Sequence, residues 1–172
     1  MSAILTTVAK HEFSISDHAP ASSLYVFSGG GGAPIWGNTG ADWAKLVDHF
    51  QSKVSRTRLQ IPIVYGVDAV HGNSNLYGTT IFPHHVALGA TRNPDLVRKM
   101  GAAAARETAG TGIRWAFSPA VSVCKDPRWG RCYESFSERT ELVSLVATAE
   151  VRVGRYALPH SPFRPLIFIW NV

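Results

Sequence analysis

In this 172-residue chain, the residues best placed to do chemistry are acids that follow predicted β-strands. The stretch Ile61–Gly72 begins with an apolar, β-branched run and then presents a single acid, Asp68. Buried parallel strands have this composition, and α/β barrels place active-site groups at the carboxyl ends of such strands. Asp68 is therefore a candidate site residue, and the nearby His71 is a candidate for orienting its carboxylate.

A second polar cluster, from Asp126 to Glu134, follows another predicted strand and holds two arginines around Trp129-Gly130. An arginine beside an aromatic ring suits sugar recognition. The guanidinium can make paired hydrogen bonds to hydroxyls while the ring stacks on a sugar face. An arginine–aspartate pair that only locks the loop explains the same residues equally well.

A glycosidase also needs two carboxyl groups flanking the bond that it cleaves. Asp68, Asp126 and Glu134 are the acids at predicted strand ends, and their spacing selects no pair among them.

Other residues suggest chemistry less strongly. The adjacent His84 and His85 would point apart on a regular element, which favours structural roles over metal binding. Cys124 and Cys132 lie eight residues apart and could close a small loop or be two buried thiols. The glycines at 29–32 lack the Gly-Lys-Ser/Thr of a phosphate-binding loop. We expect no metal and no cofactor.

The elements expected to position these groups alternate between strand and helix. A strand at Leu24–Phe27 precedes the glycines, and a helix at Ala41–Val54, capped by Asn38 or Thr39, leads into a strand at Ile61–Tyr65. This order is a βαβ unit, which implies parallel pairing.

The pattern continues with a second helix that starts at the cap Asn93 and ends at Gly110. Its expected buried stripe is Leu96, Val97, Met100, Ala103 and Ala104. A strand at Ile113–Val123 and a helix from about Ser137 to Ala149 follow, the latter with Leu142, Val143, Val146 and Ala149 inward. Past Glu150 the pattern fails, and an apolar run at the chain terminus, residues 166–170, is an expected aggregation hazard.

Composition narrows the class of protein. Hydrophobic residues make up 45% and charged residues 17%, which is typical of a soluble globular domain. The net charge of +5 is scattered, whereas a nucleic-acid-binding surface would be clustered. No apolar run approaches the ~18 residues of a membrane span. We expect neither a nucleic-acid nor a membrane partner, and the amino end makes no convincing signal peptide.

Three stretches, IPIVYGVDAVHG, NLYGTTIFPHHVALGATRNPDLV and FSPAVSVCKDPRWGRCYESFSE, resemble the amino-terminal barrel domain of glycoside hydrolase family 3, in particular plant β-glucosidases and exo-β-glucanases. The resemblance implies a retaining hydrolase that removes glucose from the non-reducing ends of β-glucosides or β-glucan oligosaccharides. By position, it implies that Asp68 and Arg131 bind sugar hydroxyls and that Cys124 and Cys132 form a disulfide. It assigns Asp126, Arg128 and Glu134 to shaping the loop, and it implies an extracellular or cell-wall location.

The sequence also departs from the family pattern. The family's nucleophilic aspartate, in a Ser-Asp-Trp type segment, and the acid/base glutamate of its second domain have no counterpart here. We therefore expect a divergent lead-in at 1–23, a partial (β/α)8 TIM-barrel domain at 24–148 and a divergent tail at 149–172. With about three βα units the barrel would not close. The leading expectation is an inactive fragment with no catalytic residue, and the alternative is a non-catalytic sugar-binding or regulatory fragment.

Overall fold

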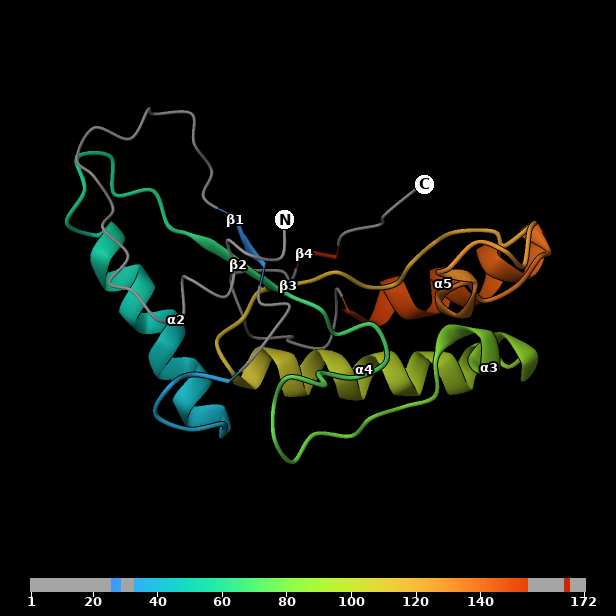
Figure 1. The fold of residues 1–172 in the computed structure, drawn as a ribbon, viewed down its shortest axis with the longest axis horizontal. Coiled ribbons are helices and arrows are strands. Elements are labelled where there is room, and N and C mark those ends of the chain that lie inside the picture. The colour runs from blue at the N-terminus through green and yellow to red at the C-terminus, as the bar shows by residue number, and fades with distance from the viewer. Residues whose placement is uncertain (1–25, 29–32, 155–165, 168–172) are drawn as a thin grey trace.

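A computed structural model describes residues 26–28, 33–154 and 166–167 of the chain (Figure 1). In these residues one sheet of four strands has the order β1-β2-β3-β4, and each neighbouring pair is parallel. The strands are β1 (Val26–Ser28), β2 (Val64–Val67), β3 (Trp115–Ala116) and β4 (Leu166–Ile167).

Helices connect these parallel strands, as the alternating sequence pattern predicts. They are α2 (Gly40–Val54), α3 (His85–Ala90), α4 (Pro94–Gly110) and α5 (Thr140–Gly154), with a short 3-10 turn, η1 (Cys132–Glu134). Figure 1 shows α4 and α5 side by side, and α2 at the other end of the molecule. The architecture is therefore α/β with a parallel sheet, and the sheet does not close into a barrel within the described residues.

Helix α2 starts at a capping box. Thr39 and Asp42 each bond the backbone of the other, with Thr39 N donating to Asp42 Oδ2 over 2.9 Å. Asn38, the other expected cap, instead accepts a 2.7 Å hydrogen bond from Trp43 Nε1. The apolar face of the helix is buried against β2 and the start of β3 through Trp43, Val47 and their neighbours.

Helix α4 begins at the predicted cap, where Asn93 Oδ1 accepts from Leu96 N over 3.0 Å. The buried face follows the helical period and comprises Val97, Met100, Gly101, Ala104 and Thr108. The expectation that Leu96 is buried is wrong: this side chain is 44% exposed because it lies about 100° around the helix from Val97. Ala103 is only partly buried for the same reason.

Helix α5 lies later than predicted. Ser135–Ser137 is held to the preceding extended segment, because Ser135 Oγ donates to Ser122 O over 2.6 Å and Cys124 N donates to Ser137 O. A backbone committed in this way cannot start a helix. At the other end the helix runs to Gly154 and so carries Glu150 into the interior.

Two strands also differ from expectation. β2 starts three residues later than predicted and runs through Gly66, where a side chain would collide with the rings of Trp115 and Phe117. β3 covers only Trp115–Ala116 of the predicted Ile113–Val123. Phe117 N still donates to Val67 O, but Pro119 carries no N–H with which to extend the ladder.

Part of the apolar carboxyl-terminal run belongs to the sheet. Leu166 and Ile167 pair with Trp115 and Ala116 as strand β4. The remainder of this run, the predicted lead-in at 1–23 and the glycine loop at 29–32 lie outside the described residues.

A glycine in α3 fixes how closely this helix approaches the loop that precedes α5. A Cβ at Gly89 would overlap the main-chain oxygen of Phe136, whereas a Cβ at Gly110, at the end of α4, would meet nothing. We expect Gly89→Ala to lower the free energy of unfolding by about 3 kcal/mol through overpacking. Gly110→Ala is the matched control and should change it by less than about 1 kcal/mol. Urea unfolding of both variants measures the difference, and equal stabilities would contradict this packing.

Candidate functional site

Asp68 lies where the sequence predicts it, immediately after the last residue of β2. Its side chain is exposed, and its main-chain oxygen accepts a 3.1 Å hydrogen bond from Asn75 Nδ2. Asn75 belongs to the loop that follows, so this bond ties the loop back to the strand end. The carboxylate is thus presented at the carboxyl edge of a parallel sheet, where ligands of α/β proteins bind.

Arg131 lies at the start of turn η1 and forms a two-pronged ion pair with Glu134. Its Nε donates to Glu134 Oε1 over 2.9 Å, and its Nη2 donates to Glu134 Oε2. The Glu134 side chain is only 12% exposed, while that of Arg131 is 44% exposed. The pairing holds the guanidinium in one plane with part of its surface open.

Asp68 and the Arg131–Glu134 pair feel one another's charge. The pKa of Asp68 is raised, first because the surrounding protein removes part of the water around its exposed carboxylate and then by the negative charge of Glu134, while Arg131 lowers it. The hydrogen bonds from Arg131 are the main reason that the pKa of Glu134 lies below its ordinary value. The fold therefore places Asp68 and Arg131, the two residues predicted to bind sugar, within range of one another's charge and of Glu134.

The expectation that His71 orients Asp68 is wrong. Its Nδ1 lies 2.6 Å from the main-chain oxygen of Phe82, and its ring lies 3.8 Å from the ring of His84, measured between centroids. His84 also contacts the Tyr133 ring edge-on. Its pKa is lowered, first by burial and then by the charge of His71. These rings support the loops around Asp68.

His85 links the two loops that carry the site. Its fully buried ring stacks on Phe136, with Nδ1 2.8 Å from Glu134 O and Nε2 2.9 Å from Val70 O. Val70 follows Asp68 by two residues, and Glu134 is the partner of Arg131. A neutral imidazole has one N–H, so it donates to only one of these two carbonyl oxygens at a time.

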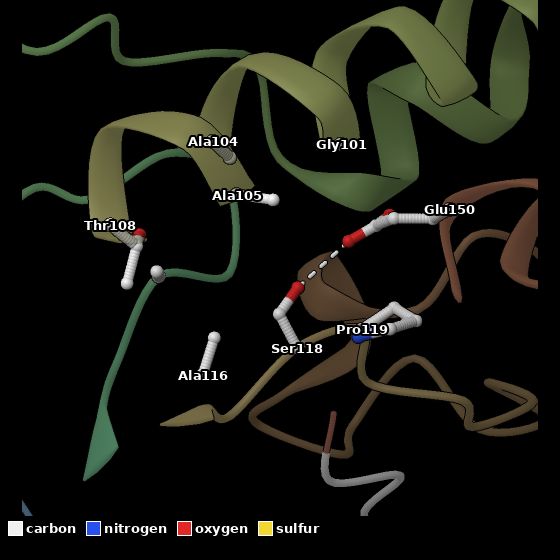
Figure 2. Close-up of a pocket in the computed structure, with 9 residues that line it drawn as sticks. Gly101, Ala104, Ala105, Thr108, Ala116, Ser118, Pro119 and Glu150 are labelled. Carbon is white, nitrogen blue, oxygen red and sulfur yellow. Dashed lines mark hydrogen bonds between the residues drawn. The ribbon is translucent and has the colours of Figure 1, made fainter. Parts of the chain in front are cut away.

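Glu150 and Ser118 complete this buried network (Figure 2). Ser118 Oγ donates to Glu150 Oε1 over 2.8 Å and lies 3.3 Å from Val70 O, while Glu150 Oε2 lies 3.6 Å from His85 Nε2. Both side chains line a cavity of about 40 Å³, whose other walls are small residues of α4 and of the segments that follow β2 and include β3. This volume has room for one or two water molecules and is too small for a sugar.

Two cross-links hold the loop that contains Asp126 and Glu134. Cys124 and Cys132 form a disulfide with their Cα atoms 5.3 Å apart. Inside the loop, Arg128 Nε donates to both carboxylate oxygens of Asp126 over 3.0 Å. Both arginines around Trp129 are therefore paired with acids, and through these pairs Asp126 and Glu134 hold the loop in shape.

The structural role expected for His85 is confirmed, whereas its partners Ser118 and Glu150 were missed by sequence reasoning. Only one signal was available in the sequence, a glutamate on the apolar face of a helical pattern. Within the described ranges, no group of three or more histidine, cysteine or acidic side chains could hold a metal ion, and no helix is long and apolar enough to cross a membrane.

The family assignment comes from comparison with known proteins. Residues 29–155 match the model of the glycosyl hydrolase family 3 N terminal domain. The chain belongs to this family. The family's N-terminal domain is an α/β fold of the TIM-barrel type, which agrees with the parallel sheet and helical crossovers found here.

Individual relatives agree with this family. The chain is 32% identical over 126 residues to a lysosomal beta glucosidase of Dictyostelium discoideum, covering 73% of this chain and 15% of the relative. An exo-1,3/1,4-beta-glucanase from a Pseudoalteromonas species matches with a TM-score of 0.69 and 43% identity, over 76% of this chain and 17% of its own. A beta-glucosidase from Listeria innocua, solved in complex with glucose, matches with a TM-score of 0.59 and 30% identity, over 74% and 16%.

The chain thus spans about a sixth of the length of these family members. The relatives come from an amoeba, from bacteria and from fungi, so the expected resemblance to plant enzymes in particular is not supported.

The buried network makes a pH prediction. Burial raises the pKa of Glu150 to about 8 from an ordinary 4.5, and lowers the pKa of His85 to about 4 from an ordinary 6.5. Folded Glu150 keeps a proton that the unfolded chain loses, so its contribution to stability falls as the pH rises from 4.5 to 8. Folded His85 refuses a proton that the unfolded chain accepts, so its contribution falls as the pH drops from 6.5 to 4.

The two effects oppose each other between pH 4.5 and 6.5, and only the Glu150 effect remains above 6.5. The other charged groups facing His85 are His84 and Glu134. We expect the free energy of unfolding to fall by about 1–2 kcal/mol from pH 6.5 to 8, and Glu150→Gln to remove this fall. Glu141→Gln, at an exposed position of the same helix, is the control. Urea unfolding at both pH values tests this, and an unchanged slope in Glu150→Gln would refute the assignment.

Proposed function

We propose that this chain carries part of a glucose-binding subsite of the β-glucosidase or exo-β-glucanase type and binds sugar without hydrolysing it. The observation that carries the proposal is the placement of Asp68 beside the Arg131–Glu134 pair at the carboxyl end of β2. A carboxylate that accepts and a guanidinium that donates can together bind neighbouring hydroxyls of one pyranose ring.

The proposed ligand is a β-glucoside or a β-glucan oligosaccharide. Family membership supports it, as do the solved structures of the beta-glucosidase from Listeria innocua with glucose, laminaribiose and isofagomine. In this proposal, Asp68 accepts hydrogen bonds from two adjacent hydroxyls. Arg131 donates to the same sugar from the side of η1, held in place by Glu134.

The proposed lack of turnover follows from the chemistry of glycoside cleavage. A retaining hydrolase needs a nucleophilic carboxylate and a second carboxyl group about 5 Å away that acts first as acid and then as base. Of the two acids at this site, Glu134 is committed to Arg131 through both of its oxygens, which keeps its pKa low and makes it a poor acid. Asp68 alone cannot supply both roles. Hydrolysis would then require carboxyl groups from elsewhere in a longer protein.

A titration with glucose and with laminaribiose, followed by NMR, tests the binding. We expect Asp68→Asn to weaken binding about tenfold or more, because it replaces an ionic acceptor of hydroxyl hydrogen bonds by a neutral amide. The matched control is Asp48→Asn, on the exposed face of α2, which should bind as the unmodified chain does. Equal affinities of the two variants would contradict the proposed role of Asp68.

The absence of turnover is tested separately. We expect the purified chain to release no aryl alcohol from an aryl β-glucoside above the rate of its Asp68→Asn variant. Release that exceeds this control would show that the chain is itself a hydrolase and would overturn this part of the proposal.

We further propose that the chain matures in an oxidising, extracellular compartment, where disulfides persist. The bond between Cys124 and Cys132, which are the two cysteines of the sequence, supports this. We expect the protein from its natural source to take up a thiol alkylating reagent only after reduction, as read by mass spectrometry. Labelling without reductant would speak for a reducing compartment.

A further inference from the structure

A shallow pocket beside the disulfide loop has no role in the function proposed above. It has a volume of about 200 Å³ and is lined by Ser122, Val123, Lys125 and Trp129. Neither Asp68 nor Arg131 lines it. Pockets for drug-sized ligands start at about 300 Å³, so this pocket suits one small ring and not an oligomer.

An unused polar atom lies just behind the wall of the pocket. Ser122 is 7% exposed, and in the described part of the chain its Oγ has no hydrogen-bond partner. A buried hydroxyl without a partner destabilises a protein, so such a group at the wall of a pocket points to a ligand or a water molecule that satisfies it. The neighbouring main chain is fixed, since Ser122 O accepts from Ser135 Oγ over 2.6 Å.

Trp129 supplies a flat apolar wall. It lies inside the loop that the Cys124–Cys132 disulfide closes. Its own backbone is held on both sides: Trp129 N donates to Asp126 O over 3.0 Å, and Cys132 N donates to Trp129 O over 3.1 Å. The main chain that carries the indole is therefore fixed before any ligand arrives, which reduces the entropy lost on binding. None of the ring contacts found among the described residues involves this indole.

Lys125 adds hydrogen-bond donors at the rim. Its Nζ donates to Glu138 O over 2.9 Å, which orders the side chain and uses one of the three donors of the ammonium group. An aromatic face, a buried hydroxyl and an ammonium group around one small hollow match a ring that is apolar on its face and hydroxylated on its edge.

We propose that this pocket is a second carbohydrate subsite that binds a single pyranose ring. The C–H face of the sugar stacks on Trp129, its ring hydroxyls bond Lys125 Nζ, and rotation of the Ser122 side chain about χ1 brings Oγ from behind the wall to a further hydroxyl. Because Asp68 and Arg131 do not line this pocket, occupation of it does not require the subsite at the end of β2.

The experiment follows the indole N–H signals of the full chain by NMR while methyl β-glucoside is added. We expect the Trp129 signal, assigned by its loss in Trp129→Phe, to shift in a saturable way. Read from backbone amide signals, which both variants retain, Trp129→Ala should weaken binding at this site about tenfold, and Trp129→Phe much less, because a phenyl ring keeps a stacking face. Trp36→Ala, which removes an exposed tryptophan on another loop, is the matched control and should not weaken it.

Ser122→Ala separates a binding role from a structural one. We expect it to weaken binding about fivefold, the usual effect of one hydrogen bond, and to make the free protein more stable by removing an unpartnered buried hydroxyl. A more stable variant with unchanged affinity would overturn the proposed contact. This measurement does not depend on Trp129→Ala folding correctly.

Two further measurements separate this pocket from the subsite at β2 and from a simple anion site. Asp68→Asn should leave the shift of the Trp129 signal intact, so a failed glucose subsite at β2 would not mimic a failure here. If that variant abolished the shift, the pocket would not be a separate site. A titration with glucuronate tests whether the pocket is a simple anion site. If it alone binds, salt displaces it and Trp129→Ala has no effect, then the site is an anion site around Lys125, and the proposal is wrong.

Discussion

The buried imidazole of His85 is the constraint on which the candidate site depends. It lies between two main-chain oxygens, one in the loop after Asp68 and one in the turn that carries Arg131 and Glu134. The two loops are far apart in the sequence, and each would move independently if only its own strand held it. Through one ring, the end of β2 and turn η1 keep a fixed separation, and the carboxylate and guanidinium that they bear remain within electrostatic reach.

Residues from three further segments of the chain contact this imidazole or its partners. Phe136 stacks on the ring, Ser118 after β3 shares the Val70 oxygen with it, and Glu150 of α5 lies beside it. The close approach of Gly89 to Phe136 brings α3, which bears His85, against this loop. A polar network of this kind is costly to bury, because each group must find a partner, and it specifies one arrangement of loops for the same reason.

The disulfide loop adds a second level of order. The Cys124–Cys132 bond and the Asp126–Arg128 pair hold the segment that leads into η1. Trp129 and Arg131 are therefore presented from one constrained turn. Trp129 lies beside an unpartnered serine, and Arg131 is paired with Glu134. Two neighbouring residues of one motif thus serve different surfaces: Arg131 the proposed glucose subsite, and Trp129 the proposed second subsite.

The sequence by itself determined the local elements and supplied the candidate site residues. Apolar periodicity and caps at Thr39 and Asn93 specify α2 and α4, because both signals act over a few residues. The apolar run before Asp68 specifies a strand that ends in an acid. The family motifs predict Asp68 and Arg131 as sugar contacts. In the fold these two residues lie within range of one another's charge.

Only the tertiary structure decided the rest. The start of α5 depends on Ser135 and Cys124 bonding across two segments, and the short β3 depends on Pro119 and on which neighbours remain to pair. His71 follows Asp68 closely but bonds Phe82, while His85, for which the sequence indicates a structural role without naming its partners, joins both site loops. These contacts span from about ten to about fifty positions of the chain, and hydrogen bonds of that range follow from packing and not from neighbouring residue types.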